Sequence, residues 1–196
     1  SVLPNEYLPY MFTIQDLLIK KENLNDDVLN GIADYIDPSK MEGGSASDLI
    51  DSAINLAISS GLNKVIIPRL CPAVPFSGDI WLLDRAVQLP NDFTLILNDS
   101  HLQLKPGVND NVIRSKNVTD KSQGENITVI GYGDATIDGN AVNQTTNMDS
   151  YKRIGLLFFN VNKFRVEGIR VKNTHGWGMS FESGTCYGEI RRIIID

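Results

Sequence analysis

The sequence predicts an all-β solenoid, a parallel β-helix with a helical cap at its N-terminal end. Three observations lead to this class. Helical patterns are confined to the first 61 of the 196 residues, short β patterns separated by Asn, Asp and Gly fill the rest, and apolar positions recur near the end at a fixed interval. Because 42% of the residues are hydrophobic, a chain of this length can bury a sizeable core.

Residues 1–44 form a helical prefix in this prediction. Apolar residues fall at three- and four-residue spacings over residues 13–36, as in an amphipathic helix: Ile14, Leu17, Leu18, Leu24, Val28 and Ile32. Pro38 and the Gly43-Gly44 pair end the prefix.

A second helix is predicted to begin at Ser45, because Ser45-Ala-Ser-Asp48 fits a capping box. It carries an apolar stripe made of Leu49, Ile50, Ala53, Ile54 and Ala57. Gly61 supplies a stop signal, and a strand is predicted directly afterwards over residues 64–68.

From residue 80 onward the sequence consists of short β patterns. The predicted strands are 80–83, 86–89, 93–97, 101–104, 111–114, 126–130, 135–138, 154–159, 163–167, 169–172, 177–182 and 189–195. Such a series is typical of a sandwich, a barrel or a repeat architecture, and the spacing between equivalent residues distinguishes them.

The spacing favours the repeat. Leu156 and Phe158 return after 23 residues as Met179 and Phe181, and after 24 residues Val166 returns as Ile190, Ile169 as Ile193 and Val171 as Ile195. Several strands that return at one period indicate stacked coils, with an antiparallel sandwich of coincidental spacing as the alternative. Residues 45–196 are therefore predicted to hold the capping helix and the first coils.

Earlier coils are longer. Leu104 to Ile137 is 33 residues and Ile137 to Val171 is 34, and the polar segment 140–153 is predicted to be a loop on one side. Asparagine tolerates the left-handed backbone region, so turns of successive coils are expected at Asn98, Asn140, Asn173 and Asp196.

Composition excludes several classes of protein. The formal charge of −6 argues against a general nucleic-acid binder, and no uncharged apolar run approaches the length of a membrane span. No signal peptide is visible at the N-terminus. Neither of the two cysteines, Cys71 and Cys186, sits in a metal-ligand spacing, and His101 and His175 are too few for a His-rich site. We expect no metal and no other cofactor.

Three segments resemble a known family. Ser47–Pro68 resembles the opening of the pectate-lyase-like superfamily, in which a helix plugs a right-handed β-helix. Ile127–Asn140 is similar to the Gly-x-Gly-x-Ile-Asp-Gly-Asn segment of polygalacturonase-type glycoside hydrolases, and Arg153–Trp177 is similar to a later run of that family. The resemblance covers residues 47–196 and implies a right-handed parallel β-helix and an inverting hydrolase of a polysaccharide.

The chain also departs from that family. Arg153-Ile154 stands in place of Arg-Pro, and Thr174-His175-Gly176 replaces Ser-Pro and its neighbour. The motifs that supply the family's acid, base and substrate-binding cation (Asn-Thr-Asp-Gly, Asp-Asp, Gly-His-Gly and Arg-x-Lys) belong to later coils. The catalytic residues are therefore unknown, and this chain alone is expected to be inactive.

Four residues are candidates for binding a polysaccharide: Glu182, His175, Trp177 and Arg170. Strand alternation places Glu182 outward with Gly178 and Ser180, so it either lines a groove or is a solvated charge at a strand end. By the same alternation, Trp177 lies on the face of the strand that carries the core residues. This favours an interior aromatic side chain over one that stacks on a sugar.

The other two candidates, His175 and Arg170, have equally plain alternatives. His175 lies in a glycine-flanked turn, which is typical of a surface turn histidine. Asp138, which is not one of the four, is interpreted as a turn-capping aspartate beside Gly139. Residues 151–196 carry a net charge of +4, and Arg165, Arg170 and Lys172 alternate with core positions. An acidic polymer such as a polyuronate would be attracted to them, unless they form an ordinary solvated exterior.

The function predicted from sequence is that of the N-terminal portion of a carbohydrate-active protein. The first hypothesis is a polygalacturonase-like hydrolase. A non-catalytic polysaccharide-binding adhesin is the alternative, and a polysaccharide lyase is the third. The resemblance favours an extracellular or periplasmic location. Because Ile193-Ile194-Ile195-Asp196 ends on an apolar strand, we expect the chain to be the first half of a larger domain or to self-associate through that end, without nucleic-acid or membrane partners.

Overall fold

The computed structural model describes residues 34–69, 79–145 and 149–196. The chain divides into two compact units, Ser1–Asp34 and Tyr35–Asp196, and almost all described residues belong to the second. Most of the helix predicted over 13–36 and the whole of Cys71 lie outside the described residues. The described end of that segment is not helical, because Ile36 forms an isolated parallel bridge with Val65. The division of the chain after residue 44 stays a prediction.

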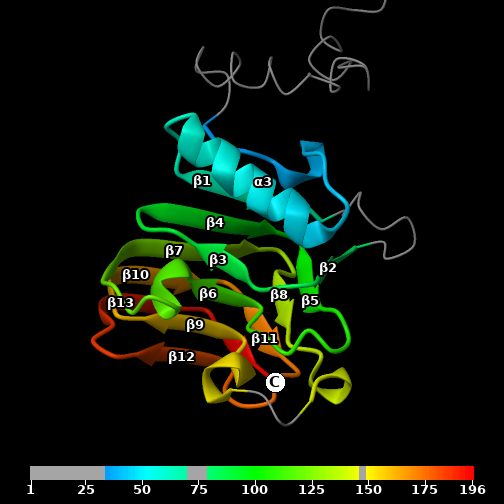
Figure 1. Cartoon of the computed structure of the whole chain (residues 1–196), viewed down its shortest axis with the longest axis vertical. Coiled ribbons are helices and arrows are strands. Elements are labelled where there is room, and N and C mark those ends of the chain that lie inside the picture. Colours follow the sequence, from blue (N-terminus) through cyan, green and yellow to red (C-terminus); the bar gives the residue numbers. More distant parts are fainter. Residues whose placement is uncertain (1–33, 70–78, 146–148) are drawn as a thin grey trace, which may run out of the picture. The chain divides into compact units, whose positions relative to one another are not determined.

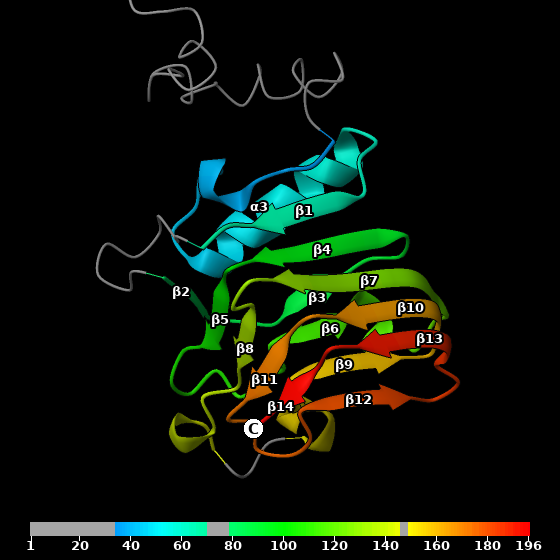
Figure 2. The same ribbon diagram turned by 180° about the vertical axis from the view of Figure 1, so that it is seen from behind.

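The described strands form three parallel sheets, and consecutive strands belong to different sheets (Figures 1 and 2). Sheet A contains β1 (Lys64–Ile67), β4 (Phe93–Asn98), β7 (Gly124–Tyr132), β10 (Val161–Glu167) and β13 (Cys186–Arg191). Sheet B contains β2 (Ile80–Leu83), β5 (His101–Leu104), β8 (Thr136–Asp138), β11 (Arg170–Lys172) and β14 (Ile194–Ile195). Sheet C contains β3 (Val87–Leu89), β6 (Ile113–Ser115), β9 (Leu156–Phe159) and β12 (Met179–Glu182). Each strand therefore pairs with the strand three places later in the chain.

The fold class predicted from sequence is wrong as stated. The described residues combine three parallel sheets of side-by-side strands with one α-helix, which is a parallel α/β-type arrangement, and nothing in it specifically shows a right-handed β-helix solenoid. The physical reason is that a sequence repeat specifies which strands pair but not the handedness of the connections. The helix is also part of the packing, since it contacts β1, β2 and β3.

That helix, α3 (Ala46–Ser59), has the ends that the sequence predicted. The Ser45 side chain accepts a hydrogen bond from the Asp48 backbone N–H at 3.2 Å and caps the first turn. Gly61 follows the last turn at φ +72°, a conformation that glycine adopts without strain. The predicted apolar stripe is buried: Leu49, Ile50, Ala53, Ile54 and Ala57.

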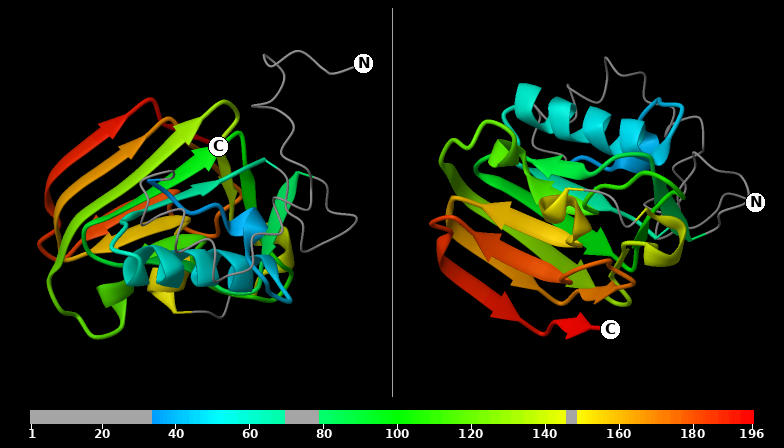
Figure 3. Two further views of the ribbon diagram at one scale, coloured as in Figure 1. Left: turned by 90° about the horizontal axis from the view of Figure 1, so that it is seen from above. Right: turned by 60° about the horizontal axis from the view of Figure 1, so that its bottom comes forward.

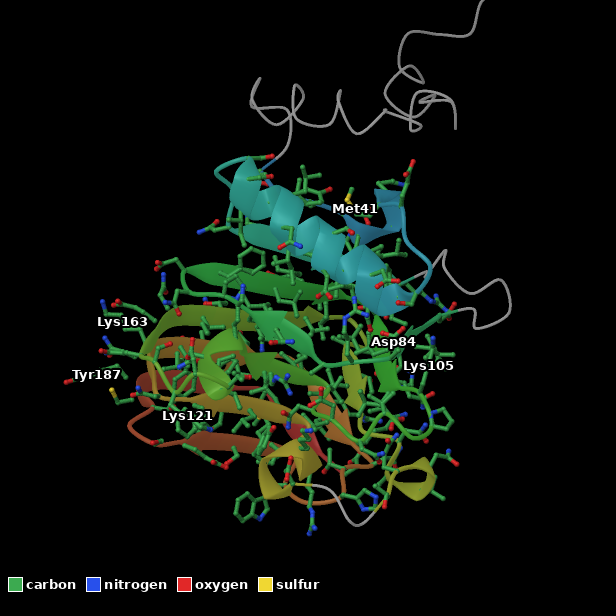
Figure 4. All side chains as sticks on the ribbon, in the orientation of Figure 1. Met41, Asp84, Lys105, Lys121, Lys163 and Tyr187 are labelled. Carbon is green, nitrogen blue, oxygen red and sulfur yellow. The ribbon has the colours of Figure 1, made fainter. Side chains whose placement is uncertain are left out.

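An arginine attaches this helix to the sheets. The Arg85 guanidinium, just before β3, lies 2.8 Å from Asp48 and 2.7 Å from Asp51 on the helix, and 2.9 Å from Asp84. Asp84 is also 3.8 Å from the Lys105 amine, and Figure 4 shows these two residues next to each other below the helix. Helix and strands are thus joined by an ion-pair network as well as by apolar burial.

The register confirms the repeats near the end of the chain and corrects one earlier repeat. Leu156 pairs with Met179, Val166 with Ile190, and Ile137 with Val171, as their spacing predicted. Ile137 pairs with Leu102 rather than Leu104, so the preceding interval is 35 residues instead of 33. The run predicted as one strand over 189–195 forms two strands, β13 and β14, separated by Arg192 at φ +51°.

Left-handed residues stack from one strand to the next. Asn140 and Asn173 have φ values of 50° and 51°, as predicted for turn asparagines, whereas Asn98 belongs to strand β4. A further column in sheet A is formed by Asp92, Asn126, Lys163 and Tyr187, with φ between 52° and 61°. Figure 4 shows Lys163 and Tyr187 at the same end of that sheet. The left-handed conformation therefore persists even where the residue is not Asn or Gly.

Candidate functional site

Three loops that lead from sheet B to sheet C build the candidate site. They are residues 105–112 between β5 and β6, residues 139–155 between β8 and β9, and residues 173–178 between β11 and β12. Because the sheets are parallel and stacked, these loops all leave at the same edge. The predicted insertion 140–153 is the longest of them, and its described parts contain two short 3₁₀ turns, Ala141–Asn143 and Ser150–Arg153.

Two hollows that share Ile154 open between these loops. The smaller has about 220 Å³ of empty space, including open solvent, and is lined by Asp110, Gly139, Gln144, Lys152, Arg153, Ile154, Gly155, Thr174 and His175. The larger, with about 670 Å³ including open solvent, is lined by Tyr151, Ile154, Trp177 and Glu182. We call the pair the loop groove. Three of the four residues predicted from sequence line it: His175, Trp177 and Glu182.

Glycines allow two of the loops to approach closely. The Gly155 N–H donates to the Trp177 carbonyl at 3.1 Å, and the Gly176 N–H donates to the Arg153 carbonyl at 2.8 Å. A Cβ at Gly155 would lie 2.7 Å from the Gly178 carbonyl oxygen. The segments on either side of the groove are thus held together by backbone hydrogen bonds that larger residues would disrupt.

Trp177 is exposed. The prediction that it is an interior aromatic, which was based on its alternation with the core residues, is therefore wrong. The exposed fraction of Trp177 is 67%, and β12 begins only at Met179, so strand alternation does not extend back to it. Gly178, predicted to face outward, is buried instead, because a Cβ there would contact Ile195 and Val171. A flat aromatic side chain is therefore presented to solvent at the larger hollow.

Glu182 ends strand β12 and is half-buried beside Trp177 in the lining of the larger hollow. Its carboxylate accepts a hydrogen bond from the Ser180 hydroxyl at 2.8 Å. Two alternatives were predicted for Glu182, a groove-lining residue and a solvated charge at a strand end. Its place in the lining favours the first.

His175 is half-buried in a bend of the smaller hollow, where its Nε2 lies 3.3 Å from the Gln144 carbonyl oxygen. Arg170 lies elsewhere, at the start of β11 in sheet B, 3.6 Å from Asp196. The structure thus separates Arg170 from the other three candidates.

The positive charges of residues 151–196 are largely paired. Described ion pairs join Lys152 to Asp149, Lys163 to Glu125, Arg165 to Glu167 and Glu189, Arg170 to Asp196, Lys172 to Asp138, Arg191 to Glu189 and Arg192 to Glu167. Attraction of an acidic polymer by these cations is correspondingly weakened. The solvated-exterior alternative accounts for Arg165 and Lys172 better than an anion-binding patch does.

A buried carboxylate on sheet B is the feature that sequence reasoning missed. The Asp138 side chain is 3% exposed and accepts hydrogen bonds from Gln103 and Asn173 at 3.1 Å and from the Asn140 backbone at 2.8 Å. His101 Nε2 and Lys172 Nζ lie 3.5 and 3.6 Å from the same carboxylate. The predicted turn-capping role is present, but it is one contact among several.

These neighbours set the charge of Asp138. Burial acts to raise the pKa of this carboxyl, but His101, the Asn140 backbone, Gln103 and Asn173 outweigh it and hold the pKa far below its usual range. The carboxylate is therefore ionised, enclosed and saturated with donors, which suits a structural link between β5, β8 and β11. The 35-residue register, which places Gln103 opposite Asp138, is the signal that would have revealed it.

A buried asparagine fixes the loop that carries Tyr151 and Ile154. Asn111 is fully buried, and its side-chain amide donates to the Tyr151 carbonyl at 2.6 Å and to the Ile154 carbonyl at 2.8 Å. Tyr151 also lies 5.8 Å from the Lys121 amine in a cation–π geometry. The wall of the loop groove is therefore held from the interior.

Replacing Asn111 by alanine is expected to destabilise the protein by about 2 kcal/mol, because two buried carbonyls lose their donor. The effect should be local to the groove wall, with faster hydrogen exchange of residues 149–155. Hydrogen exchange with mass spectrometry checks this. The Asn117→Ala variant serves as a matched control, since Asn117 is also buried and its side-chain amide donates to two carbonyls outside this segment, those of Ser122 and Phe159. Equal acceleration in both variants would contradict the role assigned to Asn111.

Among the described residues, no group of three or more His, Cys, Asp or Glu side chains could hold a metal ion. Cys186 is free and exposed. No helix in the described part of the chain is long and apolar enough to cross a membrane. Comparisons with family models, curated proteins and solved structures found no match for this chain.

Proposed function

We propose that the chain binds a polysaccharide in the loop groove. The observation that carries this proposal is the position of Trp177, which is 67% exposed beside Tyr151 and Glu182 in the larger hollow. An exposed aromatic face offers a large, rigid apolar surface that suits the C–H face of a sugar ring, and a neighbouring carboxylate accepts hydrogen bonds from sugar hydroxyls. The open shape of the groove fits an extended chain better than an enclosed small molecule.

Binding has better support than hydrolysis. Inverting glycoside hydrolysis needs two carboxylates, one on each side of the scissile bond. Within the described residues, Glu182 is the carboxylate that lines the larger hollow, and Asp110 is the one that lines the smaller hollow. Asp110 lies 2.5 Å from the Arg114 guanidinium, so it is held in an ion pair. The family resemblance remains the basis for proposing a hydrolytic parent protein. The loop groove by itself supports a binding protein, and a lyase that depends on a metal has no ligand cluster among the described residues.

The test is affinity electrophoresis of the purified chain against a panel of neutral and acidic plant and bacterial polysaccharides. We expect at least one polymer to retard the chain. Trp177→Ala should then weaken that binding by about tenfold or more, because the principal stacking surface is removed. Tyr132→Ala is the matched control, since Tyr132 is also exposed, at 52%, but belongs to sheet A.

Failure of the whole panel to retard the chain would count against the proposal. So would equal weakening by both aromatic variants, because it would separate binding from the loop groove. Release of reducing sugar from a retarded polymer would instead favour the hydrolytic form of the prediction.

A further inference from the structure

The loops 139–155 and 173–178 leave sheet B side by side. The Ala141 N–H donates to the Asn173 carbonyl at 2.9 Å, and a Cβ at Gly139 would lie only 2.7 Å from the same carbonyl oxygen. The right panel of Figure 3 brings these loops forward, the first in yellow and the second in orange. Their first turns are therefore in direct backbone contact, and both loops then line the smaller hollow.

One carboxylate holds the first turns of both loops. Asp138 accepts a hydrogen bond from the Asn140 backbone N–H at 2.8 Å, and both of its oxygens lie 3.1 Å from the side-chain nitrogen of Asn173. Because the Asn173 amide donates from the end of β11 to the end of β8, it fixes the start of one loop relative to the start of the other.

The same contacts extend to residues that line the groove. His175 follows Asn173 by two residues, and its Nε2 lies 3.3 Å from the Gln144 carbonyl oxygen. Gln144 is in turn held by the preceding loop, since its side-chain amide donates to the Lys105 carbonyl at 3.0 Å. The segment that carries His175 and Trp177 is thus attached to its neighbour at two points, Asn173 and His175.

We propose that Asn173 is a positioning residue of the loop groove, and that its hydrogen bond to Asp138 holds His175 and Trp177 where a ligand contacts them. The inference rests on the proposed function for the identity of that ligand, but not for the position of the loop. The left-handed backbone of Asn173, at φ 51°, does not by itself require an amide, because glycine adopts it as readily. The amide adds the donor that the carboxylate accepts.

Asn173→Asp tests the contact directly, because it places a second carboxylate against Asp138, which is ionised at neutral pH. The charged or titratable groups that face Asp138 from the neighbouring strands are His101 on β5 and Lys172 on β11, at 3.5 and 3.6 Å. Arg170, the other cation of β11, pairs with Asp196 at 3.6 Å. Repulsion between the two carboxylates should make hydrogen exchange of the loop about tenfold faster at pH 7.

Two further variants separate the causes. Asn173→Gly keeps the backbone conformation and removes the amide without adding charge, so exchange of the loop should be only about threefold faster. Asn126→Asp is the matched control. Asn126 also has a left-handed backbone, at φ 53°, and donates to the Asp92 carboxylate at 3.1 Å, but it lies in β7 of sheet A. This variant should leave exchange of residues 173–178 unchanged.

Lowering the pH tests whether repulsion is the cause. Two carboxylates in contact cannot both stay ionised as the pH falls, so the introduced group gains a proton and can donate to Asp138. Each variant is compared with the unsubstituted chain at the same pH, which cancels the effect of protonating His101. The excess exchange of Asn173→Asp should fall to about twofold or less near pH 4.5, whereas that of Asn173→Gly should not recover.

Affinity electrophoresis then connects the loop to binding. With a polymer that retards the chain, Asn173→Asp should bind about tenfold more weakly at pH 7 and recover near pH 4.5, and Asn126→Asp should bind normally. Faster loop exchange without binding of any polymer would overturn the polysaccharide proposal and leave the positioning role standing. Unchanged exchange of residues 173–178 in Asn173→Asp, or equal acceleration in Asn126→Asp, would overturn the positioning role itself.

Discussion

Replacing Gly131 by alanine is expected to destabilise the protein by about 3 kcal/mol, because the added methyl group would overlap backbone atoms. A Cβ at Gly131 would lie 2.4 Å from the Gly168 carbonyl oxygen, 2.6 Å from the Ala135 Cβ and 2.8 Å from Ile169. The closest of these atoms is backbone, so it cannot move aside as a flexible side chain would. Urea unfolding followed by circular dichroism measures the loss.

The matched control for that change is Gly44→Ala. A Cβ at Gly44 meets only the Asp48 carboxylate, at an ordinary 3.7 Å, so less than about 1 kcal/mol should be lost. Similar losses in the two variants would show that the contact between β7 and the turn at Gly168 is looser than the structure indicates.

The second large effect is expected from Asp138→Asn. The change removes a buried negative charge and leaves Gln103, Asn173 and Lys172 facing an amide that can accept fewer hydrogen bonds. A loss of about 3 kcal/mol at neutral pH follows. Asp134→Asn is the matched control, because Asp134 is exposed in the turn before β8 and should cost almost nothing.

The same variant predicts a change in acid stability. Since the folded pKa of Asp138 is lowered from 3.8, its ionised form stabilises the fold fully above about pH 5. That contribution disappears as the pH falls below 3.8 toward the folded pKa. Free energies of unfolding measured from neutral pH to about pH 2 should therefore fall less steeply for Asp138→Asn than for the unsubstituted chain. Parallel curves would contradict the assigned role of this carboxylate.

Local patterns predicted the elements of the described chain well. Ser45 caps α3, the apolar stripe is buried, and most strands begin and end within two residues of their predicted bounds. These features depend on neighbours in sequence, namely capping hydrogen bonds, helical periodicity and strand alternation. They could be predicted because the interactions that cause them are local.

Register was harder to predict. A shift of two residues in a strand keeps every side chain on its own face, so Leu102 and Leu104 satisfy the apolar pattern equally as partners of Ile137. The structure selects Leu102, and this choice brings Gln103 opposite Asp138. The hydrophobic pattern alone could not show that Asp138 is enclosed by partners from three strands.

The candidate site was predicted only in part, because its arrangement also depends on contacts between residues far apart in the sequence. His175 and Trp177 come from the loop 173–178 and Glu182 from strand β12, and the sequence singled out all three. Their arrangement around Ile154 depends on the 149–155 segment, which Asn111 holds across 40 residues or more of sequence. Trp177 is exposed because β12 begins only at Met179. The prediction of an interior Trp177 assumed that the strand began at residue 177, and this start was not itself tested by the pattern.

The sequence by itself determined where the strands lie, how the helix is capped and which late positions return to pair with each other, because these depend on short-range periodicity. Only the tertiary structure decided the parallel α/β-type arrangement of three sheets, the exposure of Trp177, the enclosure of Asp138 and the separation of Arg170 from the loop groove. Each of these depends on contacts between strands that are tens of residues apart. The loops that connect those strands vary in length, so no single repeat fixes the contacts in advance.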